Sequence, residues 1–138
     1  MFFAVERINR ILKELETWSH VPTALVDDIR FRPCGYNDYE LVNAPADDWD
    51  QYTLHQNWGG VDQHYWFRAK IGIPQELAGR KVILVAKTGR TGWDALNPQF
   101  LAYINGKVVQ GLDVNHTEIL LAERAKAGTE YVLDLYAY

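Results

Sequence analysis

Two segments with a hydrophobic period of two constrain the fold most strongly. In residues 65–73 the side chains alternate between two sets, and residues 130–138 alternate in the same way. Such alternation places successive side chains on opposite faces of a β-strand, so each segment predicts a strand with one buried face. A chain with such strands must pair them in a sheet and cover that face. In the first segment one face holds Tyr65, Phe67, Ala69, Ile71 and Ile73, and the other holds Trp66, Arg68, Lys70 and Gly72.

Further strands are predicted in the same half of the chain. Asn105-Gly106 separates residues 100–104 from 107–110, and this dipeptide favours a hairpin because both central positions of a type I′ turn need a positive φ. Residues 81–87 and 118–121 predict two more strands. Short strands separated by turn signals are typical of an antiparallel β-sandwich, for which we expect about eight strands in total.

The start of the chain has a helical period instead. Its apolar residues recur at the three- and four-residue spacing of one helix face, and His20-Val21-Pro22 ends the pattern. A helix with so narrow an apolar face is not stable alone, so we expect residues 3–18 to pack outside the sandwich or on another domain. The predicted organisation is a helix in residues 1–22 and one sandwich domain in residues 23–138. The apolar face holds Ala4, Val5, Ile8, Ile11, Leu12, Leu15 and Trp18.

Residues 27–62 carry eight acidic and two basic side chains. Pro33, Gly35, Pro45 and the Trp58-Gly59-Gly60 turn signal interrupt this stretch. It therefore predicts a long irregular segment with a few short strands, and its acidity is typical of a solvated surface.

Composition excludes several classes of protein. The 138 residues suit one domain, and the net charge of −4 argues against a nucleic-acid partner, whose binding face would be basic. No apolar run approaches the roughly 20 residues of a membrane span. Glu6 and Arg7 interrupt the opening apolar residues, so no signal peptide is predicted. The single cysteine, Cys34, excludes an internal disulfide, and we expect a cytoplasmic protein.

Catalytic motifs are missing from the sequence. His20, His55, His64 and His116 are scattered, and Asp62-x-His64 is the one tight pairing of metal-ligating residues. The nucleophile elbow, the phosphate loop and the dinucleotide fingerprint are all absent. We therefore predict no metal and no cofactor in this chain, and an inert thiol at Cys34.

Two loops and one tryptophan carry the candidate contacts. Residues 111–118 form either a polar turn that bonds its own backbone or a contact with something outside the domain, and their two carboxylates are not expected to catalyse alone. Residues 91–99 either plug the end of the sandwich with a tryptophan or stack that ring on a sugar. The third candidate is Trp66, which lies on the less apolar face of its predicted strand. Unless that face is covered too, we expect its side chain to be exposed and to contact a partner. The candidates are Trp66, Trp93, Asp94, Asp113, Asn115, His116 and Glu118.

Several runs of sequence resemble the N-terminal β-domain of bacterial and cytosolic class II α-mannosidases, glycoside hydrolase family 38. The longest are residues 58–68 (WGGVDQHYWFR), 92–101 (GWDALNPQFL) and 110–118 (QGLDVNHTE). Shorter matches lie at residues 73–74, 77–82 and 103–106, and the opening helix is similar too. The resemblance implies a jelly-roll sandwich similar to galactose-binding domains.

The resemblance also implies a role within a larger enzyme. Members of this family hydrolyse α-mannosides with retention at a zinc site, and the zinc ligands and aspartate nucleophile lie in a following catalytic domain that nothing here matches. The chain is thus expected to be a non-catalytic domain that packs on the catalytic domain of the same protein and helps shape it. An independent carbohydrate-binding module for mannose-containing saccharides is the alternative. A complete small enzyme would need a converging acid–base pair.

Overall fold

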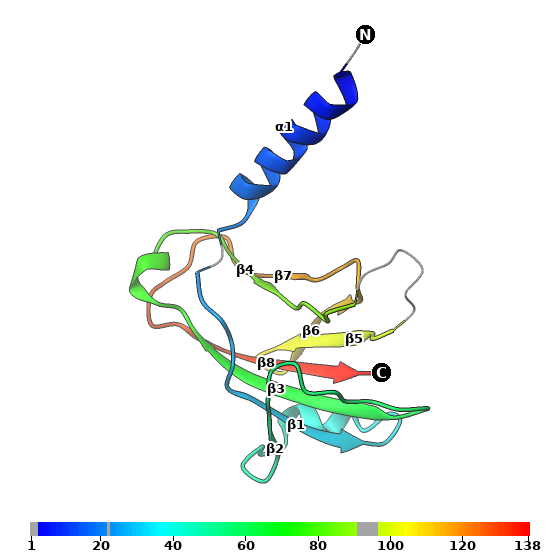
Figure 1. The fold of residues 1–138 in the computed structure, drawn as a ribbon. Coiled ribbons are helices and arrows are strands. Elements are labelled where there is room, and N and C mark those ends of the chain that lie inside the picture. Colours follow the sequence, from blue (N-terminus) through cyan, green and yellow to red (C-terminus); the bar gives the residue numbers. More distant parts are fainter. Residues whose placement is uncertain (1–2, 22, 91–96) are drawn as a thin grey trace.

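A computed structural model describes residues 3–21, 23–90 and 97–138 (Figure 1). One α-helix precedes a chain of strands with two short 3₁₀ helices between them. In chain order these elements are α1 (Ala4–Ser19), β1 (Ile29–Cys34), η1 (Tyr39–Asn43), β2 (Asp50–Tyr52), β3 (His64–Gly72), η2 (Gln75–Leu77), β4 (Val82–Val85), β5 (Phe100–Ile104), β6 (Lys107–Leu112), β7 (Glu118–Ala122) and β8 (Glu130–Ala137). None of the helices in the described residues is long and apolar enough to span a membrane.

The strands form two antiparallel sheets that face each other (Figure 1). The larger sheet has the order β2-β1-β3-β8-β5-β6, and the smaller sheet pairs β4 with β7. The two strands predicted from a period of two, β3 and β8, pair over eight residues near the centre of the larger sheet, from Tyr65↔Ala137 to Gly72↔Glu130. A mainly β fold with antiparallel sheets and an N-terminal helix is thus confirmed.

The core between the sheets is built from the predicted apolar faces. Ala102, Leu112, Ile119 and Leu133 form its buried centre. Ile71 of β3 and Leu135 of β8 pack against that centre, in agreement with the alternation read from the sequence. Burial of this face between two sheets is the main contribution to stability that the fold can make.

The opposite face of the larger sheet is also covered, and this corrects the expectation for Trp66. Residues 35–49 run across that face, where Leu41 and Val42 pack against a cluster of Trp49, Trp66 and Tyr136. Trp66 is 0% exposed, and its Nε1 donates a hydrogen bond of 2.9 Å to the carbonyl oxygen of Asp38. The predicted exposed contact at Trp66 is therefore wrong, because the irregular segment forms a second layer over it.

A buried ion pair fastens this second layer to the sheet. The Nε of Arg68 lies 2.5 Å from Oδ1 of Asp134, and both side chains are largely buried. The same guanidinium donates to the carbonyl oxygens of residues 41, 42 and 44 and lies 4.9 Å from the ring centre of Trp49. Burial raises the pKa of Asp134, and the hydrogen bond and charge of Arg68 oppose that rise.

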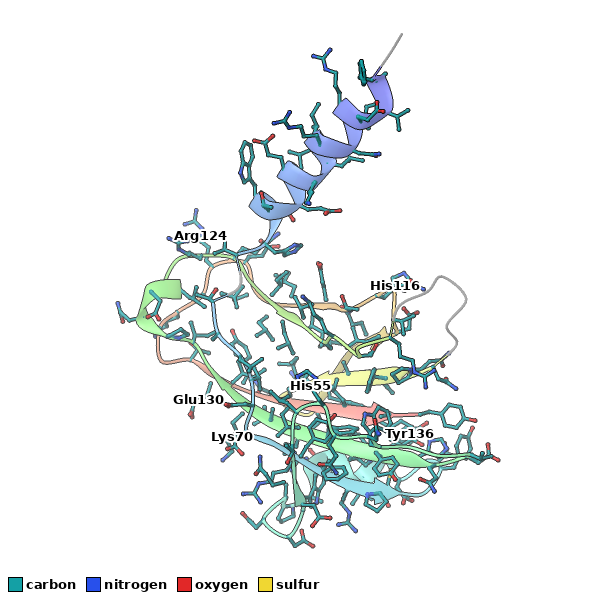
Figure 2. All side chains as sticks on the ribbon, viewed as in Figure 1. His55, Lys70, His116, Arg124, Glu130 and Tyr136 are labelled. Carbon is teal, nitrogen blue, oxygen red and sulfur yellow. The ribbon has the colours of Figure 1, made fainter. Side chains whose placement is uncertain are left out.

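Helix α1 does not pack on the sandwich, contrary to one of the two placements expected from its sequence. It extends away from both sheets in Figure 1, and Figure 2 shows its side chains projecting into open space. None of its residues is buried. The helix itself was predicted correctly to within one residue at each end, but its apolar face is uncovered.

The acidic middle segment contains the strands that the sequence did not locate. β1 pairs with β3 from Ile29↔Ala69 to Cys34↔His64, while β2 pairs only with Ile29–Phe31. From Arg32 onward β1 is thus an edge strand that pairs only with β3. Proline has no backbone N–H to donate, so Pro33 is tolerated at an edge, where one side of the strand makes no ladder hydrogen bonds.

Candidate functional site

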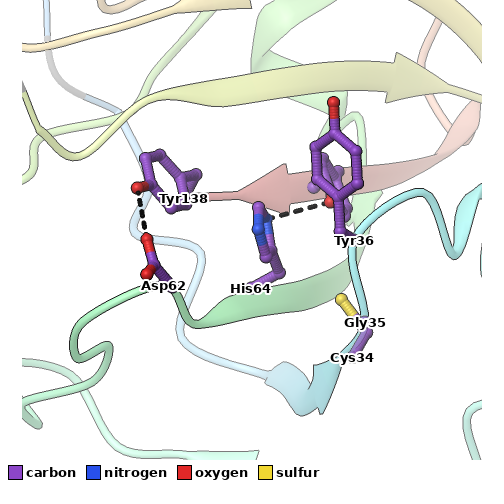
Figure 3. A pocket seen from close by; sticks show the side chains of 7 residues that line it. Cys34, Gly35, Tyr36, Asp62, His64 and Tyr138 are labelled. Atoms are coloured by element: carbon purple, nitrogen blue, oxygen red, sulfur yellow. Dashed lines mark hydrogen bonds between the residues drawn. The ribbon is translucent and has the colours of Figure 1, made fainter.

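A hollow lies where three strands end, and we call it the strand-end hollow (Figure 3). Antiparallel pairing brings the end of β1, the start of β3 and the end of β8 side by side at the same end of the sheet, as the register Cys34↔His64 and Tyr65↔Ala137 shows. Its volume is about 540 Å³, within the usual range of ligand pockets. It is lined by Cys34, Gly35, Tyr36, Asp62, His64, Tyr136 and Tyr138.

The imidazole of His64 is held in place from three directions. Its ring stacks on Tyr136 at 5.4 Å and 14° and on Tyr138 at 4.8 Å and 25°, measured between ring centres and planes. Its Nδ1 lies 2.9 Å from the Oη of Tyr136. The amide of Asn37 donates to that same Oη at 3.4 Å, so the Tyr136 hydroxyl can donate to Nδ1. With this proton assignment the neutral ring of His64 carries its own proton on Nε2.

Asp62 and Tyr138 form the second fixed pair of the hollow. The hydroxyl of Tyr138 donates to Oδ1 of Asp62 at 3.2 Å (Figure 3). This hydrogen bond and the charge of Asp62 raise the pKa of Tyr138. Asp62 has a positive φ of 53°, an uncommon conformation for a residue other than glycine, in which aspartate and asparagine are enriched. Cys34 also lines the hollow, and burial raises its pKa to about 11, which keeps the thiol protonated at neutral pH, in line with the predicted inert cysteine.

The loop that the sequence singled out makes a separate and smaller hollow of about 360 Å³, the loop hollow. It lies between β6 and β7, where Figure 2 labels His116, well apart from Tyr136 on β8. The two hollows share no lining residue. The loop hollow brings together three of the predicted residues, and its lining is Gln110, Asn115, His116, Thr117 and Glu118.

Asp113 does not line the loop hollow but forms hydrogen bonds with two residues that do. Its Oδ1 accepts hydrogen bonds from the amides of Asn115 and His116, both at 2.7 Å, and both of its oxygens lie 3.0 Å from Nδ1 of His116. The bond to His116, followed by the amide bonds, lowers the pKa of Asp113. Glu118 has a different partner, Nε2 of His20, at 3.3 Å. The turn therefore bonds its own backbone, as one of the two interpretations expects, and still leaves His116 exposed.

The remaining predicted residues have mixed outcomes. Trp66 lies in the covered cluster described above and reaches neither hollow. Trp93 and Asp94 lie outside the described residues. The sequence had pointed to Asp62 and His64 only as a weak metal pair, and it missed Tyr36 and Tyr138. The signal for Tyr138 was present, because it shares a strand face with Tyr136 in the final period-two segment.

Metal binding has no support in the described part of the chain. No three histidine, cysteine, aspartate or glutamate side chains converge there in a way that could hold an ion. The strand-end hollow offers aromatic faces, one carboxylate and one imidazole, which can bind a polar ligand with an apolar face.

Comparison with known proteins places the chain in a family. Residues 26–137 match the family model described as "Alpha-mannosidase, jelly roll domain". No curated protein matches the chain. The match covers both sheets and every strand of the structure, and the mainly β antiparallel architecture agrees with it. The chain therefore belongs to the family of α-mannosidase jelly roll domains.

Proposed function

We propose that this chain is the non-catalytic N-terminal domain of a family 38 α-mannosidase of the bacterial or cytosolic type, and that it packs on the catalytic domain. The family match over residues 26–137 and the resemblance of residues 58–68, 92–101 and 110–118 support this assignment. The catalytic domain of the same protein, in the cytoplasm, would hold the zinc ion and the aspartate nucleophile. This domain would shape that neighbour without breaking the glycosidic bond.

The uncovered face of α1 is the observation that carries the packing role. Its large apolar side chains are all between 51% and 71% exposed, namely Val5, Ile8, Ile11, Leu12, Leu15 and Trp18. Isolated helices of about this length are marginal in water, so α1 needs a partner that covers this face. In a mannosidase the partner that is always present is the catalytic domain of the same chain. Just beyond the C-terminal end of α1, Nε2 of His20 lies 3.3 Å from Oε1 of Glu118, and this contact links the end of the helix to β7.

Hydrogen exchange of the α1 amides tests this packing. In the 138-residue chain we expect these amides to exchange rapidly, whereas in the intact mannosidase they should be protected by about 100-fold or more, since packing stabilises the helix. Leu12→Glu places a charge in the apolar face and should remove the protection. Lys13→Glu, on the opposite face, is the matched control and should keep it.

Two results would contradict this role of α1. Equally rapid exchange in the intact enzyme would show that no domain covers the helix. Protection in the 138-residue chain that grows with protein concentration would assign the apolar face to a second copy of the chain.

The loop hollow is proposed to face the catalytic domain near its cleft. Asp113 orients His116, so Asp113→Ala and His116→Ala in the intact enzyme are expected to lower mannosidase turnover by about 10–100-fold, as loss of supporting groups does. His116 is exposed, so His116→Ala should change the thermal unfolding of the domain little. Asp113→Ala removes the acceptor of two backbone amides, so it should lower the unfolding temperature modestly and leave the domain folded. Lys107→Ala, at the end of β6 away from the loop, is the control. Wild-type turnover in both loop variants would leave the loop as a polar turn only.

A further inference from the structure

We propose that the strand-end hollow binds one pyranose ring of a neutral glycan, between Tyr36, Asp62, His64 and Tyr138. The inference does not depend on how α1 or the loop hollow contacts a catalytic domain. It assigns a ligand to a surface that lies apart from both of those elements.

The aromatic rings supply the apolar part of such a site. Tyr36 is 74% exposed and Tyr138 is 43% exposed, so neither side chain is buried in the core and both can contact a ligand. Tyr36 stands beside His64 with 5.5 Å between ring centres and a 55° angle, while Tyr138 stacks on His64. Figure 3 shows Tyr36 and Tyr138 on either side of the imidazole. The C–H face of a pyranose can pack on an exposed tyrosine ring while its hydroxyls remain free to bond.

The polar groups of the hollow match sugar hydroxyls. Asp62 presents a carboxylate, which can accept hydrogen bonds from hydroxyl groups, and only one bond to it, from Tyr138, is found in the described chain. His64 makes no hydrogen bond through Nε2 to any described residue, and stacking and the Tyr136 contact fix the direction of its ring. A donor and an acceptor at fixed positions are what a specific polar ligand needs from a largely preformed pocket.

The charge of the hollow selects a neutral ligand over an anion. Neither lysine nor arginine is among its lining residues, and Asp62 would repel a phosphate, sulfate or carboxylate group. The volume of about 540 Å³ is sufficient for a small saccharide. A quaternary ammonium ion could use the same rings through cation–π contacts, and it therefore serves as the competing ligand in the test.

Nuclear magnetic resonance titration of the 138-residue chain tests the site, with methyl α-mannoside and an α-linked mannobiose as probes. We expect saturable shifts at Tyr36, His64 and Tyr138 with dissociation constants of about millimolar. Tyr36→Ala should weaken binding by about tenfold or more, because it removes the exposed ring. Trp18→Ala removes an equally exposed ring on α1 and is the matched control, which should bind like the wild type.

A second variant tests the polar half of the site. Asp62→Asn keeps a residue that tolerates the positive φ and removes the negative charge, so the fold should persist while saccharide binding weakens. Three results would each overturn the proposal: no saturable shift with either saccharide, shifts confined to residues 110–118, or tighter binding of tetramethylammonium than of the saccharides. The hydrogen-exchange experiment on α1 is independent of all three.

Discussion

Asp134→Ala is expected to lower the free energy of unfolding by about 3–5 kcal/mol, the usual cost of removing one partner from a buried ion pair. The variant leaves the guanidinium of Arg68 inside the protein with carbonyl oxygens as acceptors but without a counter-charge. Domains of this size have a total stability of only about 5–15 kcal/mol, so much of the stability would be lost. Urea unfolding followed by tryptophan fluorescence measures the change.

Two controls separate burial from charge. Lys81→Ala breaks an exposed pair with Glu123, whose side chains are 60% and 67% exposed, and should have almost no effect. Asp134→Asn keeps an oxygen that can accept from Nε of Arg68 and removes only the charge, so it should be more stable than Asp134→Ala. A cost for Asp134→Ala no larger than that of Lys81→Ala would show that the pair is solvated in solution.

Trp66→Ala is expected to cost about 3–5 kcal/mol, because it leaves a large cavity between the sheet and the segment that covers it. The side chain is completely buried and loses a hydrogen bond to Asp38 as well. Trp66→Phe should cost less, since most of the volume stays. Thermal unfolding of the three proteins gives the order of stability.

Trp18→Ala provides the comparison for this second prediction. Trp18 is 71% exposed, and surface substitutions usually change stability by less than about 0.5 kcal/mol. Similar losses for Trp66→Ala and Trp18→Ala would mean that residues 35–49 do not form a stable layer over the sheet. In that case Trp66 would be exposed to solvent in solution, as its strand face alone predicts.

The strands of the second half could be predicted because each carries a local signal. β3 and β8 follow from their alternation, and β5 and β6 follow from the Asn105-Gly106 turn between them. The helix was equally readable from its period. These signals are local, so they identify elements and buried faces but not the partner of each face.

The covering of the larger sheet could not be read from the sequence for that reason. The alternation correctly separates Trp66 from Phe67, but it does not say that residues 35–49 return over the Trp66 face. This layer has little regular structure and is fastened through main-chain carbonyl groups, which every residue possesses. For α1 the sequence left open whether the sandwich or another domain covers its apolar face, and the structure excludes the sandwich.

The strand-end hollow was only partly readable. Asp62 and His64 are close in sequence, and their residue types and spacing indicate at most a weak metal-ligating pair. Tyr36 and Tyr138 lie far from them and reach the hollow only through the register of β1 with β3 and of β3 with β8. Without that register no spacing rule brings the four residues together.

The attachment of Arg68 to the carbonyl groups of residues 41, 42 and 44 limits how this domain can vary between related proteins. A substitution there keeps the carbonyl oxygens in place, so the guanidinium retains its acceptors whatever the new side chain is. An insertion or deletion of one residue shifts those oxygens and leaves a buried cation without acceptors. Related chains should therefore differ in residue type but not in length between Asp38 and Trp49, and insertions should gather instead in surface stretches such as residues 53–61.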